Sequence, residues 1–238
     1  MDTVKISRGQ THMIAHRGLS GLEKENTAAA FVAAANRSYY GIETDVHITS
    51  DGKFILHHDA TVRDPAGASY RIAKTPFDTL RRICFAQDGV VRADLRMPLL
   101  EEYLMICRKY GKVAVVELKE AWSTSELERI LQAVGQMKML SATVFISFVW
   151  ENVVSLRALS PNVAIQFLWD APIDVKLVER LRNYHFGLDV AYRRLNAENT
   201  ALLQNNGIEI NAWTCDDPKR AEQLAIWGVN EITTNILE

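Results

Sequence analysis

The sequence predicts a protein of the α/β class, a (β/α)8 barrel with a small insertion after the second strand. Short apolar runs of strand length alternate with longer segments of helical period, a pattern that favours a parallel sheet. About eight such units fit into 238 residues, close to the roughly 250 residues of one barrel. An open doubly wound sheet is the alternative, but no glycine-rich nucleotide-binding turn follows the first strand.

The elements follow one another in the order that a barrel requires. The expected strands span residues 13–16, 41–47, 113–118, 143–148, 163–168, 185–189, 208–213 and 230–233. The expected helices span residues 27–36, 99–109, 125–137, 151–159, 173–183, 197–205 and 218–226. Residues 1–238 then form one domain, with an irregular insertion at approximately 59–97. This stretch is too long for a simple crossover, so we expect it over the barrel mouth, with a short helix near residues 77–83.

Residues at several boundaries support these helix limits. The hydroxyl run 123–125 offers N-caps for the helix that follows it. Pro172 and Pro218 suit first helical turns, where a missing N–H costs nothing. Gly207 favours a left-handed helix end.

Composition narrows the class of protein. Hydrophobic residues make up 48% and charged residues 24%, as in soluble globular proteins. A net charge of −2 gives no basic excess for nucleic-acid binding. The three cysteines form no zinc spacing or disulfide framework, and neither a signal peptide nor a bilayer-spanning run is visible. We therefore expect a cytoplasmic protein without stable membrane insertion. A homodimer is one candidate assembly, and the sequence leaves the oligomeric state open.

Polar residues at the ends of several predicted strands indicate an active site. Glu43 and Asp45 point to the same side of one strand, where two carboxylates repel unless a cation neutralises them. Such oxygen ligands suit Mg²⁺ or Ca²⁺. Glu117 ends the next barrel strand, and Lys119 points in the same direction. Because active residues of such barrels project from the carboxyl ends of the strands, these side chains should meet at one rim.

Histidines supply the other half of the predicted chemistry, since imidazole moves protons near neutral pH. His16 and Arg17 follow the first strand. His57 and His58 are adjacent, so at most one of them faces the site, and strand parity alone does not choose between them.

Two further side chains are candidates for the pocket. Trp213 ends the seventh strand, although aromatic residues also pack barrels well. Gln166 points inward by parity, although a buried, hydrogen-bonded glutamine needs no function.

These motifs together resemble the glycerophosphodiester phosphodiesterase family. The resemblance rests on the order and spacing of His16-Arg17-Gly18, Glu25-Asn26-Thr27, Glu43-Thr44-Asp45-Val46, Asp51-Gly52, His58-Asp59, Glu117-Leu118-Lys119 and Trp213-Thr214. It covers nearly the whole chain and implies a TIM barrel with a small insertion after the second strand. The chain departs from the family pattern at Lys24, in the stretch 60–67, and at Asn235, which stands where an aspartate is commoner.

The resemblance also implies roles for the matched residues. It makes His16 and His58 the general acid and base. Glu43, Asp45 and Glu117 become the ligands of a divalent cation, Ca²⁺ or Mg²⁺. Arg17, Lys119, Trp213, Asn26 and Gln166 are the substrate-binding candidates, with Arg17 and Lys119 on the phosphate, Trp213 on the glycerol side and Asn26 orienting the first loop.

The expected activity is metal-dependent hydrolysis of small-molecule glycerophosphodiesters to glycerol 3-phosphate and an alcohol. Two alternatives stay open. One is a related barrel phospholipase D-like enzyme that acts on lysolipid or sphingolipid head groups. Such an enzyme would need an apolar patch on the mouth loops, and the candidates for it are Phe77, Phe85 and Val90-Val91. We expect these side chains instead to pack the insertion. The other is a non-catalytic phosphate-ester binding protein.

Overall fold

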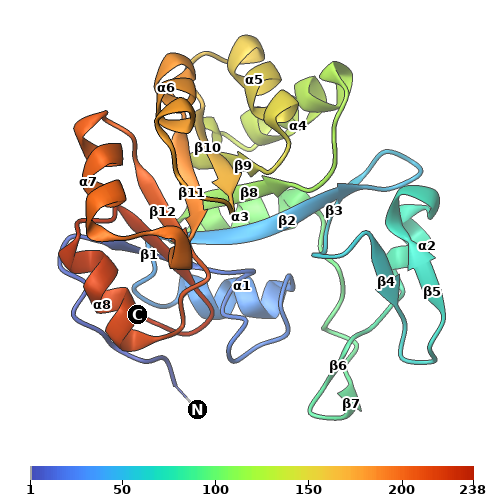
Figure 1. Ribbon diagram of the computed structural model, residues 1–238. Coiled ribbons are helices and arrows are strands. Elements are labelled where there is room, and N and C mark those ends of the chain that lie inside the picture. The colour runs from blue at the N-terminus through green and yellow to red at the C-terminus, as the bar shows by residue number, and fades with distance from the viewer. Residues whose placement is uncertain (1) are drawn as a thin grey trace.

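The computed structural model describes residues 2–238 and contains a closed barrel of eight parallel strands ringed by helices (Figure 1). The barrel strands are β1 His12–Ala15, β2 Gly41–Ile48, β8 Val113–Leu118, β9 Thr143–Ser147, β10 Ala164–Trp169, β11 Gly187–Ala191, β12 Ile210–Trp213 and β13 Glu231–Thr234. Strand β1 pairs with both β13 and β2, which closes the barrel. The predicted (β/α)8 barrel is confirmed.

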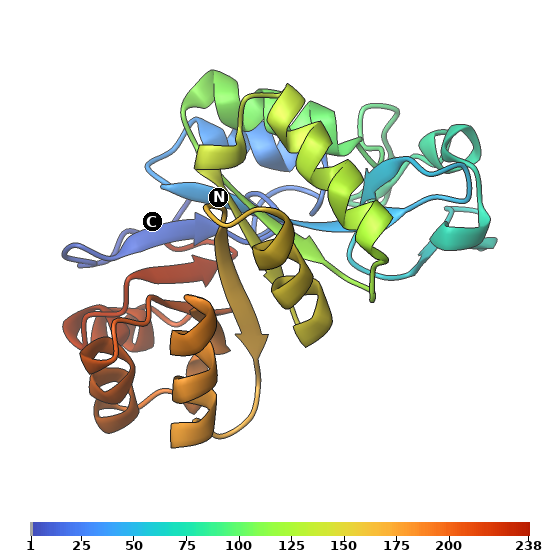
Figure 2. The same ribbon diagram turned by 90° about the horizontal axis from the view of Figure 1, so that it is seen from above.

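Helices cover the outside of the barrel (Figure 2). The α-helices of this layer are α1 Ala28–Ala35, α3 Leu100–Tyr110, α4 Thr124–Gln136, α5 Trp150–Leu159, α6 Val175–Tyr184, α7 Ala197–Asn205 and α8 Pro218–Ile226. Two 3-10 turns, η2 Leu140–Ala142 and η3 Tyr192–Arg194, lie between them. Among the described residues, no helix combines the length and the apolar character needed to cross a bilayer.

Side chains of the barrel strands alternate between two layers. Those that face outward form the main apolar core with the helices, for example Ile42 and Val116. Those that face inward form a small apolar cluster that includes Ile14 and Val115, interleaved with buried polar side chains. This alternation explains why acidic residues on the strands lie inside the barrel.

Local side-chain hydrogen bonds set the helix ends. Ser123 forms a capping box with Glu126 at the start of α4, as predicted. Pro218 occupies the first turn of α8, also as predicted. The prediction for Pro172 was wrong: α6 begins only at Val175, because the carboxylate of Asp174 accepts a hydrogen bond from the backbone N–H of Leu177 and caps the helix there.

The insertion folds around a small core of its own at one side of the barrel (Figure 1). Its elements are β4 Thr61–Arg63, β5 Ser69–Arg71, η1 Ile72–Lys74, α2 Phe77–Arg81, β6 Ala86–Gln87 and β7 Val90–Val91. It is preceded by β3 Phe54–Leu56, which pairs antiparallel with β2 and was not predicted. Together β2 and β3 carry the chain from the barrel to the insertion.

Candidate active site

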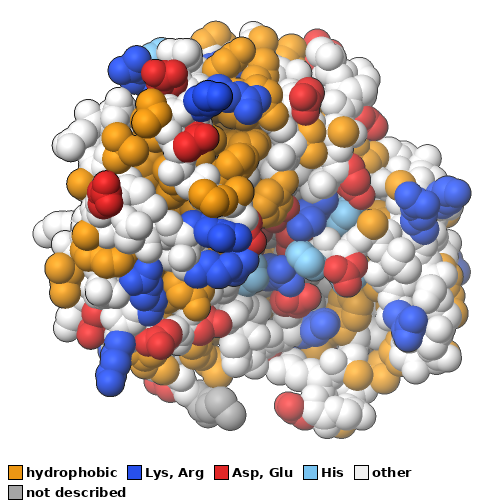
Figure 3. Space-filling model, in the orientation of Figure 1, with side chains coloured by type: hydrophobic (Ala, Val, Ile, Leu, Met, Phe, Trp, Pro, Cys, Tyr) orange, Lys and Arg blue, Asp and Glu red, His pale blue; other side chains and the backbone are white. Residues whose placement is uncertain are grey.

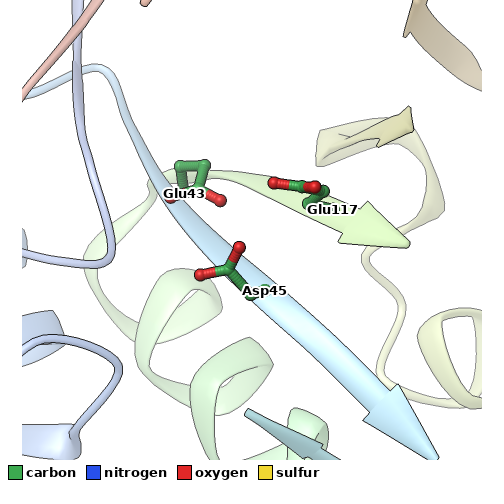
Figure 4. Close-up of side chains that lie close together, drawn as sticks. All are labelled: Glu43, Asp45 and Glu117. Atoms are coloured by element: carbon green, nitrogen blue, oxygen red, sulfur yellow. The ribbon is translucent and has the colours of Figure 1, made fainter. Parts of the chain in front are cut away.

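Three carboxylates from two neighbouring strands form the centre of the site. Glu43 and Asp45 come from β2 and Glu117 from β8, and Asp45 lies in register with Glu117. One oxygen of each lies within 4.8 Å of the others, and the three groups point toward one another (Figure 4). All three residues are at least 92% buried. The structure therefore brings together the three ligands proposed from the sequence.

The electrostatics of this cluster suit a hard divalent cation. Burial, followed by the charges of Asp45 and Glu117, raises the pKa of Glu43 well above its usual range. Burial and the charge of Asp45 raise the pKa of Glu117 to about 7. Buried like charges of this kind are stable as carboxylates only with a compensating cation nearby. Three hard oxygen donors within reach of one point are the donor set that Mg²⁺ and Ca²⁺ prefer.

Two basic side chains compensate part of the negative charge. Lys119 Nζ lies 3.0 Å from Glu117 Oε1 and 3.3 Å from Asp45 Oδ1. Arg17 Nε lies 3.3 Å from Asp45 Oδ2, and its Nη1 pairs with Glu25 Oε2 at 2.8 Å. Burial opposes ionisation of Asp45, but Lys119 and Arg17 outweigh it and hold the pKa of Asp45 below its usual range.

The first loop holds Arg17 in a strained backbone conformation. Its φ is +54°, in the left-handed region that side-chain-bearing residues rarely adopt. The backbone N–H of Arg17 donates to Glu43 Oε2 at 2.9 Å, and its carbonyl accepts from the backbone N–H of Asn26. Gly18 follows at φ +78°, where a Cβ would lie 2.6 Å from the backbone of Ala30. The tight loop thus fixes Arg17 against the carboxylates.

A chain of hydrogen bonds orients the ring of His16. Its Nδ1 lies 2.8 Å from Asn235 Oδ1, and Asn235 Nδ2 donates to Asp216 Oδ2 at 2.6 Å. Because the amide nitrogen is committed to Asp216, the amide oxygen faces the ring, and Nδ1 of His16 must carry the proton. The other ring nitrogen, Nε2, is then the basic one. Burial and the adjacent Arg17 cation lower the pKa of His16.

The side chains of the neighbouring residues His57 and His58 point in different directions, as strand parity requires. The Nδ1 atom of His58 lies 2.7 Å from Asp59 Oδ1, and its ring borders the carboxylate pocket. His57 instead stacks on Phe85, a residue of the insertion core, with ring centroids 5.9 Å apart. His47 contacts the carbonyl of His58 at 3.2 Å through Nε2. The structure therefore places His58, rather than His57, at the site.

A cavity of about 120 Å³ lies among these groups. Figure 3 shows acidic, basic and histidine side chains gathered around a hollow near the middle of this face of the molecule. Most of the lining residues come from the carboxyl-terminal ends of the strands or the loops that follow, whereas Glu43 and Asp189 are each the third residue of their strands. The full set is His16, Arg17, Glu43, His58, Glu117, Lys119, Ile146, Phe148, Leu168, Asp189, Trp213, Thr214 and Thr233.

Two of the predicted substrate-binding residues do not border this cavity. Asn26 is buried behind it and donates from Nδ2 to Asp45 Oδ2 at 2.8 Å, so it positions a carboxylate. Gln166 points into the barrel but lies near its other end, where it borders a separate cavity of about 610 Å³. Its Nε2 donates to Glu231 Oε2 at 2.8 Å.

Sequence reasoning did not select three residues that the structure brings to the site. Asn235 and Asp216 orient His16, and a deviation from the family pattern at Asn235 was the available signal. Asp189 borders the cavity from β11. Asp189 is the last residue of a predicted strand, and a position at a strand end is also the feature by which Glu117 was chosen as a candidate.

Comparison with known proteins assigns the family. A family model described as the glycerophosphoryl diester phosphodiesterase family matches residues 16–238. The chain belongs to this family. The Bacillus subtilis (strain 168) protein YhdW, itself a candidate glycerophosphodiester phosphodiesterase, is 28% identical over 230 residues, which cover 94% of each chain.

Solved structures of glycerophosphodiester phosphodiesterases share the fold. A phosphodiesterase of Oleispira antarctica, solved with the product sn-glycerol-3-phosphate, is 25% identical with a TM-score of 0.86 and covers 94% of this chain and 92% of its own. A glycerophosphodiester phosphodiesterase of Parabacteroides distasonis is 26% identical with a TM-score of 0.81, covering 96% and 94%. In both cases the likeness covers at least 94% of this chain.

Proposed function

We propose that this chain hydrolyses glycerophosphodiesters to glycerol 3-phosphate and an alcohol, using a divalent cation and two histidines. The observation that carries the proposal is the gathering of carboxylates, imidazoles and cationic side chains around one cavity. Family membership and the product-bound Oleispira antarctica structure support the substrate class. Glu43, Asp45 and Glu117 would hold the cation, either Mg²⁺ or Ca²⁺.

Phosphodiesters resist attack because their oxygens carry negative charge, and the site offers several positive groups to offset it. A bound cation would act as a Lewis acid on a phosphate oxygen. Arg17 and Lys119 border the same cavity, so their charges would stabilise the extra negative charge of the transition state. Both side chains are already held by the carboxylates, so little rearrangement is needed when the substrate binds.

The surroundings of the two histidines suggest which is the base and which is the acid. His16 has a lowered pKa and a fixed tautomer, so its Nε2 would accept a proton from the nucleophile near neutral pH. His58 has a carboxylate acceptor at Nδ1, which leaves Nε2 to donate a proton to the leaving alkoxide. The nucleophile is either water or the neighbouring glycerol hydroxyl, the latter through a cyclic phosphate.

A coupled assay for glycerol 3-phosphate tests the proposed activity. The substrates would be glycerophosphocholine, glycerophosphoethanolamine and glycerophosphoglycerol, each with Mg²⁺, with Ca²⁺ and with chelator. We expect release of glycerol 3-phosphate from at least one diester only when a cation is present. Binding of the diesters without release of glycerol 3-phosphate would instead support the non-catalytic alternative.

The pH profile should respond to a single change beside His16. In the Asn235→Asp variant a carboxylate would face His16 Nδ1 and stabilise the imidazolium, which raises the pKa of His16. A general base is inactive when protonated, so kcat/KM falls as the pH drops through its pKa. We therefore expect the acid limb of the kcat/KM profile to move to higher pH in this variant.

The matched control is Asp59→Asn, which changes the partner of the other histidine. This variant should leave the acid limb in place and alter the alkaline limb, where the general acid loses its proton. If Asn235→Asp left the acid limb unmoved, the assignment of His16 as the base would be wrong.

Exposed apolar side chains favour one second candidate, hydrolysis of lysolipids. Phe85 is buried as expected, but Val90 and Val91 are 61% and 52% exposed on the hairpin of β6 and β7, against the expectation that they pack the insertion. Phe148 is 49% exposed at the cavity edge, where it meets Trp213 edge-on. Comparing turnover of glycerophosphocholine with that of lysophosphatidylcholine micelles separates the two activities, and we expect the water-soluble diester to be preferred.

A further inference from the structure

Asp189 lies on the wall of the cavity opposite the carboxylate cluster. It is on β11, and β11 is four strands from β2 in either direction around the closed barrel. In the proposed function, the phosphate binds on the side of the cavity where Glu43, Asp45 and Glu117 lie. One of the two ester groups of a substrate that places its phosphate there would then face β11.

The opposite wall is otherwise almost free of hydrogen-bonding groups. The cavity-lining side chains from β9, β10 and the residue after β9 are Ile146, Leu168 and Phe148. Trp213 has one polar atom, Nε1, and that atom already donates to the carbonyl oxygen of Asp189 at 3.0 Å. Within residues 2–238, Asp189 is the only lining residue from β9 to β11 whose side chain can form hydrogen bonds.

The carboxyl group of Asp189 has no hydrogen-bond partner among residues 2–238. The residue is 98% buried, its Oδ1 atom has no hydrogen-bond partner, and its side chain forms no hydrogen bond to another described residue. Buried polar groups are nearly always paired, because an unpaired one costs free energy. Burial, followed by the charges of Glu231 and Glu117, raises the pKa of Asp189 well above its usual range. A carboxyl group accepts a hydrogen bond from a hydroxyl in either protonation state.

We propose that Asp189 determines substrate specificity by binding the terminal hydroxyl group of the glycerol moiety. This inference rests on the proposed function and names the part of the substrate that the β11 wall recognises. The terminal hydroxyl is the glycerol oxygen farthest from phosphorus, so it reaches farthest across the cavity. The surrounding side chains are apolar, so a diester without this hydroxyl would leave the carboxyl group of Asp189 without a hydrogen-bond partner. This cost would strengthen the discrimination between the two diesters.

The test compares two substrates in the full-length protein with saturating Mg²⁺ or Ca²⁺. One is sn-glycero-3-phosphocholine, and the other is its analogue with hydrogen in place of the terminal hydroxyl. The wild-type kcat/KM should favour the glycerol diester by about 10-fold to 100-fold, the value of one buried hydrogen bond. Asp189→Leu, which keeps the side-chain branching and removes both oxygens, should bring this ratio close to one, and Asp189→Asn should preserve most of it.

Two further variants keep the result interpretable. Asp189→Ala removes the carboxyl group without adding bulk, so it should also lose discrimination if leucine obstructs the cavity. Glu231→Gln changes another buried carboxyl group inside the barrel, at the edge of the separate cavity, and should leave the ratio as in the wild type. A wild type without discrimination, or one whose ratio persists in both Asp189→Leu and Asp189→Ala, would overturn the proposal.

Binding measurements distinguish a failure of this inference from a failure of the proposed function. If the wild type cleaved neither diester, calorimetric titration with sn-glycerol 3-phosphate and with its terminal-deoxy analogue would still compare recognition of the hydroxyl. Equal dissociation constants would refute the role of Asp189. Melting temperature gives an independent check, because a structural role predicts a loss of stability in Asp189→Leu. Loss of an unpaired buried carboxyl group predicts a melting temperature at or above that of the wild type.

Discussion

Alanine in place of His16 or His58 is expected to lower kcat for glycerophosphocholine by about 10²–10⁴-fold. Each ring borders the cavity and each has one nitrogen anchored, His16 on Asn235 and His58 on Asp59. Loss of either ring removes a proton-transfer step while leaving the carboxylates and the cationic side chains in place. Steady-state measurement of glycerol 3-phosphate release gives the effect on kcat and KM separately.

The neighbouring histidine supplies a matched control. His57→Phe keeps an aromatic ring to stack on Phe85 in the insertion and removes only the imidazole nitrogens. Its kcat should stay within a few fold of the wild type, since the ring does not border the cavity. Turnover unaffected in both His16→Ala and His58→Ala would refute the acid–base assignment.

Removal of the divalent cation is expected to abolish turnover and to lower the melting temperature. A ligand present at 100 times its dissociation constant stabilises a protein by about 2.7 kcal/mol, which corresponds to about 5–10 °C for a chain of this size. The carboxylates of Glu43 and Glu117 are buried with like charges beside them, so the cation should relieve repulsion that is otherwise present in the folded state. Thermal melts with chelator and with added Mg²⁺ or Ca²⁺ measure the shift.

A substitution within the cluster should separate metal binding from general stability. Glu117→Gln removes one of three like charges, so its melting temperature in chelator should lie at or above that of the wild type, while the shift on adding the cation should shrink. Glu231→Gln, at the other end of the barrel, should show the full shift. A full shift in Glu117→Gln would mean that the cation binds elsewhere.

The barrel was predictable because its signals are local and repeated. Strand β8 and helices α7 and α8 match their predicted limits, since apolar runs and end signals such as Pro218 are readable in one segment. Strand β3 was missed because it has only three residues and exists through antiparallel pairing with β2. No local pattern of that length separates a strand from a loop.

Strand parity predicts which way a side chain points. Parity correctly placed Glu43 with Asp45 and pointed Gln166 into the barrel. Parity does not predict how far along the barrel axis a side chain lies. Glu117 is the fifth residue of β8, whereas Gln166 is the third of β10 and lies toward the other cavity.

Residues that position other side chains of the site were the hardest to predict from the sequence. The role of Asn235 depends on Asp216, 19 residues earlier, and on the meeting of the ends of β1 and β13. The contact of Asn26 with Asp45 depends on a first loop in which Arg17, Gly18 and Asn26 all have a positive φ. Such contacts follow from tertiary packing rather than from local sequence.

The most direct test of the account is a titration of Mg²⁺ or Ca²⁺ into metal-stripped protein, with release of glycerol 3-phosphate from glycerophosphocholine followed at each step. We predict that activity rises from background and saturates at one ion per chain, and that Glu43→Gln requires a higher concentration of the ion. Full activity in the stripped protein, or an identical titration curve for Glu43→Gln, would contradict a catalytic cation held by Glu43, Asp45 and Glu117.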